Sequence, residues 1–173
     1  MLRFKFLHKN VQQNIIWMNL EFLKNTRNHP NIIKNLFHPK HQTRVEQESW
    51  YYDEYSKDLN HLIWIAYDEK KSCPIGYIQY HIETLIHRRC QVHYVVSNEF
   101  EKSKYDNKLI KWSVDNVKSW NDEFHRLTAY IFPEDSKRLE NYCSEGFEID
   151  GILREYVYRD CLYRDVMVLS KLI

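Results

Sequence analysis

Residues 135–147 read DSKRLENYCSEGF, and this stretch combines a short helix with the signal that ends it. No glycine or proline interrupts Asp135–Ser144, and Gly146 follows shortly after. Glycine readily adopts the left-handed backbone that terminates helices. The chain has only 3 glycines among its 173 residues, so few backbone positions can require that conformation. The stretch therefore predicts a helix over Asp135–Ser144 with Gly146 as its left-handed cap.

The segments around this helix alternate between strand and helix character. Arg126–Phe132 reads as a strand, and so do the two runs of the tail, Phe147–Tyr158 and Leu162–Leu169. Lys104–Trp120 has apolar residues at the i, i+3, i+4 and i+7 positions of an amphipathic helix. Further upstream, β-rich runs separated by polar turns predict three strands, Leu62–Tyr67, Ile75–Ile82 and Gln91–Val96.

The first third of the chain reads as mostly helical. Asn19 is a reasonable N-cap for a helix that stops at Asn28-His29-Pro30, and a short helix is expected over Asn31–Phe37. The capping box Thr43-Arg-Val-Glu46 opens a helix that runs to about Tyr55. Two segments compete as the first strand, Arg3–Leu7 and Asn14–Met18. The pattern as a whole predicts an α/β or α+β fold around one mixed sheet.

Composition excludes several classes of protein. Hydrophobic residues make up 43% of the chain, so a globular fold is expected, and 173 residues fit one domain. The 25 Lys and Arg residues balance 24 Asp and Glu residues, which argues against a nucleic-acid binder. There is no apolar run of about 18 residues and no signal-peptide pattern at the start, so no membrane partner is expected. The 4 cysteines form no CxxC pair and indicate free thiols in a cytoplasmic protein.

Four strings in the second half, together with the order of the expected elements, resemble the GNAT superfamily of N-acetyltransferases. Pro74-Ile-Gly-Tyr-Ile78 is similar to a strand of that family. Asp135-x-x-Arg138-x-x-x-Tyr142-x-x-x-Gly146-Phe147 has the spacing of its N-x-x-S-x-x-x-Y-x-x-x-G-F segment. Ile149–Glu155 and Tyr163–Ser170 resemble the ending of the branch that acetylates ribosomal proteins, polyamines and amino sugars.

The resemblance implies the GNAT fold, a mixed and mostly antiparallel sheet of about 6–7 strands flanked by about 4 helices. It implies a single domain over residues 1–173, with a mostly helical acceptor-side half (1–60) and an acyl-CoA-binding core (61–173). Acetyl-CoA would be the co-substrate, and a small amine would be the acceptor. The resemblance leaves open whether the protein forms a homodimer.

The acceptor is suggested by a second resemblance in the first half. Thr26-Arg-Asn-His-Pro30, followed by Glu46-Gln47-x-x-Trp50, resembles acetyltransferases that act on nucleotide-linked 4-amino sugars. A nucleotide-linked amino sugar is therefore the first expectation. Two alternatives remain: a polyamine or protein N-terminus as acceptor, and a binding module that kept the fold but lost catalysis.

The resemblance also implies where acetyl-CoA would bind. Backbone N–H groups around Tyr94, Val95 and Val96 would hold the pantetheine arm and polarise the thioester carbonyl. The family's glycine-rich pyrophosphate loop aligns with Glu101–Asp106, where both glycine positions carry larger side chains. The other residues expected to contact acetyl-CoA are Lys102, Ser103, Lys104, Tyr105, Asp106 and Asp135.

Catalysis requires a base for the amine and an acid for the leaving thiolate. Tyr142 occupies the family's tyrosine position and would be the acid, although a buried helix residue with a satisfied hydroxyl fits the pattern too. Where the family often has Glu, this chain has Gln91, which cannot act as a base. His93 is the first candidate for the base, because a neutral imidazole suits this task. His81 and Glu83 are alternatives that would act through water.

The acceptor-binding residues implied by the resemblance are Arg27, Asn28, Trp50 and His81. Arg27 and Asn28 also fit the end of a helix, where a basic side chain and a capping Asn are common. No metal is expected, because the His and Cys residues of His87-x-x-Cys90-x-x-His93 would face opposite sides of a strand.

Overall fold

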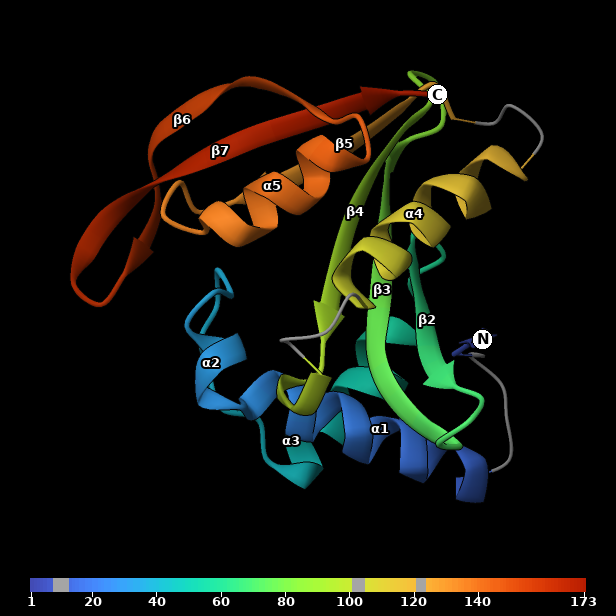
Figure 1. The fold of residues 1–173 in the computed structure, drawn as a ribbon. Coiled ribbons are helices and arrows are strands. Elements are labelled where there is room, and N and C mark those ends of the chain that lie inside the picture. Colours follow the sequence, from blue (N-terminus) through green and yellow to red (C-terminus); the bar gives the residue numbers. More distant parts are fainter. Residues whose placement is uncertain (8–12, 101–104, 121–123) are drawn as a thin grey trace.

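The computed structural model describes residues 1–7, 13–100, 105–120 and 124–173, and it shows a seven-stranded sheet with helices on both faces (Figure 1). The strand order is β1-β2-β3-β4-β5-β7-β6, and every neighbouring pair is antiparallel except β4 and β5. The strands are β1 (Leu2–Phe6), β2 (His61–Asp68), β3 (Cys73–Thr84), β4 (Arg89–Val96), β5 (Arg126–Ile131), β6 (Glu148–Arg159) and β7 (Leu162–Leu172). The predicted mixed sheet is thus confirmed. Of the two segments that competed as its first strand, Arg3–Leu7 nearly coincides with β1, whereas Asn14–Met18 lies in a helix.

The helices of the described residues depart from the prediction at their ends. They are α1 (Gln13–Asn28), α2 (Pro30–Ile33), α3 (Arg44–Ser49), the π-helix η1 (Trp50–Tyr55), the 3₁₀-helix η2 (Asn98–Phe100), α4 (Tyr105–Lys118) and α5 (Ser136–Ser144). Asn19 lies inside α1 and does not cap it. The helix starts earlier because Ile16, Leu20 and Leu23 form a buried stripe at helical spacing. None of the described helices is long and apolar enough to span a membrane.

One face of the sheet, here called the α1 face, packs against α1 and η1. Ile63, Tyr77 and Val95 alternate inward from three neighbouring strands and share a buried cluster with the α1 stripe. The Thr43 capping box is present as predicted, with the Glu46 N–H donating to Thr43 Oγ1 at 3.2 Å. Beyond it the helix widens into η1.

The other face, here called the α4 face, carries the larger core under α4 and α5. Gly76 lies where β3 passes beneath α4. A Cβ added there would clash with the Val95 carbonyl oxygen and lie 3.0 Å from Leu109 Cδ2. At the end of α5, Gly146 has φ +80° and its N–H donates to the Cys143 carbonyl at 2.9 Å, so the predicted left-handed cap is confirmed.

The close approach at Gly76 predicts that Gly76→Ala destabilises the fold by roughly 1–3 kcal/mol, because backbone and helix must shift to make room. Gly151→Ala is the matched control, since an added Cβ at Gly151 has no neighbour within 4 Å. Urea unfolding of both variants measures the difference. Equal stabilities would contradict the packing described here.

Candidate active site

The sheet opens into a fork between β4 and β5. These parallel strands pair only from Arg89 to Gln91 on β4 and from Arg126 to Thr128 on β5. β4 continues alongside β3 to Val96 after its pairing with β5 has ended. Figure 1 shows the two strands leaving this point in different directions. Among the described residues, no strand lies beside the outer edge of β4 beyond Gln91.

The direction of each backbone group on β4 follows from one hydrogen bond. The Ser97 N–H donates to the Ile75 carbonyl on β3 at 2.8 Å. Because successive residues of a strand point their N–H and C=O groups to opposite sides, those of Val92, Tyr94 and Val96 point away from β3. Tyr94 and Val96 therefore face the fork, and their predicted contact with acetyl-CoA stays a prediction. The backbone groups of Val95 point towards β3, where Val95 pairs with Tyr77, so the geometry argues against its predicted contact with acetyl-CoA.

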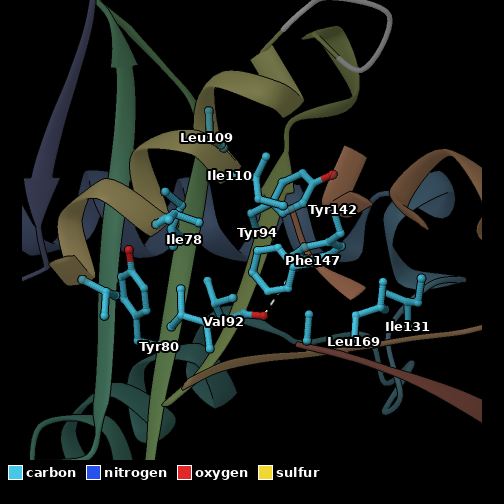
Figure 2. Close-up of a cluster of buried hydrophobic side chains, with 14 of the residues drawn as sticks. Ile78, Tyr80, Val92, Tyr94, Leu109, Ile110, Ile131, Tyr142, Phe147 and Leu169 are labelled. Carbon is cyan, nitrogen blue, oxygen red and sulfur yellow. Dashed lines mark hydrogen bonds between the residues drawn. The ribbon is translucent and has the colours of Figure 1, made fainter. Parts of the chain in front are cut away.

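Tyr142 reaches the fork from the α4 face. It lies on α5, is 1% exposed, and packs edge-on against the rings of Tyr94 (5.4 Å) and Phe147 (5.0 Å). Its hydroxyl donates to the Val92 carbonyl at 3.3 Å, the hydrogen bond drawn in Figure 2. Burial raises the pKa of Tyr142 well above its ordinary value, so the hydroxyl keeps its proton at neutral pH. It is a buried proton donor at the edge of the fork.

Arg138 brings a positive charge to the same place, a role that its position in the α5 motif does not predict. Its side chain is 15% exposed, and its guanidinium carbon lies 5.6 Å from the centre of the Tyr94 ring. Asp135 caps α5 by accepting from the Arg138 N–H at 3.2 Å, and its carboxylate lies 3.6 Å from Arg138 Nε. Asp135 thus positions the arginine, whereas its predicted contact with acetyl-CoA stays a prediction.

The predicted pyrophosphate loop is described only in part. Lys102, Ser103 and Lys104 lie outside the described residues. The Tyr105 hydroxyl donates to Asp68 at the end of β2, and this contact raises the pKa of Tyr105 and lowers that of Asp68. Asp106, in the first turn of α4, forms an ion pair with Lys137 of α5 at 3.4 Å. Lys137 thus compensates the negative charge that would repel a phosphate.

His93 lies on the α1 face, opposite Gln79 of β3, and it is half-buried. Burial lowers its pKa to about 3, and the positive charges of Arg138 and Arg27 contribute to that shift. The imidazole is neutral at pH 7, as expected, but such a weak base accepts a proton poorly. The structure therefore argues against His93 as the base. Cys90 points to the α4 face, so the excluded His-Cys-His site does not assemble.

A cavity of about 640 Å³, called cavity A, adjoins the fork on the α1 face. Its lining residues are Phe37, His38, His81, Glu83, Gln91, Tyr130, Tyr156, Val157 and Tyr158. Gln91 is the last β4 residue paired with β5, and Tyr130 lies just beyond the last paired residue of β5. Cavity A therefore approaches the fork from the side opposite Tyr142. Of the four residue types Asp, Glu, Lys and Arg, the described lining of cavity A contains only one member, Glu83.

Long-range contacts hold the walls of cavity A together. Arg159, at the end of β6, donates from Nη1 to the carbonyls of Lys34 and Leu36, the latter at 3.0 Å. This contact fixes the loop that carries Phe37 and His38 against the β6–β7 hairpin. Sequence reasoning missed Arg159, because no local pattern shows that it meets a segment so far away in the chain.

The four predicted acceptor residues do not converge on one site. His81 lines cavity A, whereas Arg27 and Trp50 line a separate cavity. Asn28 lines neither. Its amide forms two hydrogen bonds with the Gln42 backbone, at 2.7 and 2.9 Å. Arg27 donates from Nη2 to the His38 carbonyl at 2.9 Å. Both side chains thus hold the loop after α2.

No family model matches this sequence, and no curated protein sequence matches it significantly. Solved structures do resemble it. The spermidine N-acetyltransferase of Vibrio cholerae in complex with CoA and spermine superimposes with a TM-score of 0.83 at 19% identity, over 99% of this chain and 95% of that one. A variant of the SpeG spermidine N-acetyltransferase from Vibrio cholerae gives 0.79 at 21% identity, over 99% and 93%. The chain therefore has the GNAT fold.

The half-buried, neutral imidazole of His93 predicts a pH-dependent stability. The pKa is about 3 in the folded chain against 6.5 for an ordinary histidine, so between these values the unfolded chain binds the additional proton. Stability should therefore fall as the pH drops below about 6.5, by up to about 1.4 kcal/mol per pH unit for one proton. Urea unfolding at pH 7 and pH 5 should show a smaller loss in His93→Gln than in wild type. His81→Gln, at an exposed position, should behave as wild type, and identical losses in all three proteins would contradict the assignment.

Proposed function

We propose that this protein is an acetyl-CoA-dependent N-acetyltransferase whose acceptor is a small alkyl amine of the polyamine class. The observation that carries the proposal is the fork between β4 and β5. A buried proton donor, Tyr142, reaches it from one face, and a large cavity containing Glu83 reaches it from the other. Two substrates that approach from opposite faces can meet there, which is the arrangement that direct acetyl transfer requires.

The residues of the fork fit acetyl-CoA. The outward N–H and C=O groups of Tyr94 and Val96 offer strand-like hydrogen bonds to an extended, amide-containing chain such as pantetheine. Arg138 lies beside them and offers positive charge, and Lys137 offsets Asp106 at the start of α4. Acetyl-CoA supplies the acetyl group as a thioester. In this proposal Tyr94, Val96 and Arg138 hold it in the fork.

The remaining chemistry is assigned to side chains on the two faces. The amine nitrogen forms a bond to the acetyl carbon, and the carbon–sulfur bond breaks. The Tyr142 hydroxyl gives its proton to the sulfur, for which its raised pKa keeps it prepared at neutral pH. The proton of the amine passes to Glu83, directly or through water. A backbone N–H of the fork stabilises the charge that develops on the carbonyl oxygen.

Cavity A favours an amine over other acceptors. Its carboxylate, Glu83, lies 3.6 Å from Arg89 Nε and can also attract an ammonium group. Phe37, Tyr130, Tyr156 and Tyr158 offer aromatic faces that cations prefer. The similar solved structures are spermidine N-acetyltransferases, which supports the same acceptor class. The expectation of a nucleotide-linked amino sugar gains no such support, because Arg27 and Asn28, on which it rested, bind the backbone of a neighbouring loop.

Binding and turnover test the function in sequence. Acetyl-CoA at about 100 times its dissociation constant should stabilise the protein by about 2.7 kcal/mol in a thermal unfolding experiment. A screen of polyamines, amino-sugar nucleotides and peptides should then give the highest kcat/KM with a polyamine. Glu83→Gln should lower kcat, because the amine loses its proton acceptor, and should raise KM for that polyamine at least about tenfold, because a charge-assisted contact is lost. Glu69→Gln, in the turn between β2 and β3, is the control. Absence of any acetyl-CoA binding would refute the proposed acetyltransferase activity and would favour the alternative of a binding module without catalysis.

Removal of the Tyr142 hydroxyl tests the proposed role of this residue as the acid that protonates the leaving thiolate. Tyr142→Phe should lower kcat by about 10²-fold, because the thiolate then leaves without a proton donor. The affinity for acetyl-CoA should stay unchanged. Tyr80→Phe is the matched control, since Tyr80 is equally buried on the same face and donates to the Ser113 carbonyl at 2.9 Å. An unchanged kcat in Tyr142→Phe, or an equal loss in both variants, would rule out the assigned role.

A further inference from the structure

A second cavity on the α1 face is lined by an arginine, whereas cavity A is lined by a carboxylate. This cavity, called cavity B, has a volume of about 230 Å³ and lies between α1, α3 and strands β2 and β3. Its lining residues are Leu23, Arg27, Gln42, Gln47, Trp50, His61, Ile63, Tyr77 and Gln79. Among these described residues Arg27 is the one Lys or Arg, and none is Asp or Glu. Cavity B therefore has a positive charge and no carboxylate to balance it.

Arg27 is only partly satisfied by protein contacts. Its Nη2 donates to the His38 carbonyl at 2.9 Å. Its Nε is buried and has no hydrogen-bond partner among the described residues. Its charge reaches the sheet: burial raises the pKa of Tyr77 and Arg27 partly opposes that rise, whereas burial lowers the pKa of His93 and Arg27 adds to that fall. An arginine with a buried, unused N–H in a cavity favours a guest that accepts hydrogen bonds and carries negative charge.

Two further polar side chains line cavity B without a protein partner. Gln47 and Tyr77 are each 4% exposed. Neither the Gln47 side-chain amide nor the Tyr77 hydroxyl forms a hydrogen bond with another described residue. Neither the amide nor the hydroxyl is among the fully buried, unpaired side-chain atoms of the described residues, so both keep accessible surface in the cavity and are available to a guest. Burial raises the pKa of Tyr77 to about 12, so its hydroxyl remains a donor at neutral pH. Water is the simplest occupant, but water leaves the charge of Arg27 unopposed.

We propose that cavity B is a binding site for a compact anion, specifically a short-chain carboxylate. The guanidinium of Arg27 binds the carboxylate, and the Tyr77 hydroxyl and the Gln47 amide complete its hydrogen bonds. Leu23 and Ile63 provide an apolar wall for a short alkyl tail. The proposal does not rest on the acetyltransferase function, because it concerns a different cavity.

The carboxylate has two possible sources. One is a free small acid. The other is a carboxylate attached to an amine that occupies cavity A, since the cavities are neighbours: the ring of His61, which lines cavity B, lies 6.4 Å from that of His81, which lines cavity A. Competition by acetate and by 4-aminobutyrate distinguishes them. Equal displacement of a bound probe indicates a free acid, and much stronger displacement by 4-aminobutyrate indicates an attached amine.

Titration followed by ¹⁹F NMR tests the site, with trifluoroacetate as the probe and trifluoroacetamide as its neutral counterpart. Trifluoroacetate should show saturable broadening and a shift, whereas trifluoroacetamide should show neither. Spermidine should not displace the probe, because a cation is repelled by Arg27. Equal binding of the charged and neutral probes, or competitive displacement by spermidine, would overturn the proposal.

Variants then locate the site. Tyr77→Phe and Arg27→Gln should each weaken trifluoroacetate binding at least about tenfold, the value of one hydrogen bond to a charged group. Arg44→Gln removes an exposed arginine that pairs with Glu48 and lies outside cavity B, so it should bind as wild type. If Arg27→Gln fails to fold, Tyr77→Phe still decides, because it leaves the His38 contact intact. Wild-type affinity in Tyr77→Phe would contradict the site.

Discussion

The end of pairing between β4 and β5 after Gln91 is the constraint on which the candidate site depends. Strands that stayed paired would satisfy the outer backbone groups of Tyr94 and Val96 and would leave no passage through the sheet. Because they separate, one edge of β4 becomes available to an extended ligand. The two faces of the sheet then communicate at one point. Tyr142 and cavity A are significant because both adjoin that point.

The two sides of the fork are held by different interactions. On the α4 face, aromatic packing places Tyr142 between Tyr94 and Phe147 inside the larger core, which keeps its hydroxyl dry and protonated. On the α1 face, hydrogen bonds from Arg159 and Asn28 hold loop backbone and shape the cavities. A dry acid on one side and a polar, charged acceptor side on the other suit a reaction in which the two substrates differ in polarity.

Local patterns in the sequence were sufficient for most of the fold, whereas the site needed long-range geometry. Gly146 and the Thr43 capping box act over a few residues, so both were predictable. The exclusion of Val95 required the register of β4 against β3. The low pKa of His93 depends on burial and on charges from other elements, and no sequence pattern contains that information. The direction of the Arg27 side chain likewise depends on tertiary contacts, which no local sequence pattern shows.

Backbone NMR during titration with CoA tests the central claim most directly, because it reports each amide of β4 separately. The account predicts that the amide signals of Tyr94 and Val96 shift with CoA concentration and become protected from hydrogen exchange. Those of His93 and Val95, which point towards β3, should change much less. A binding response confined to other parts of the chain, with Tyr94 and Val96 unaffected, would show that the fork is not where acetyl-CoA binds.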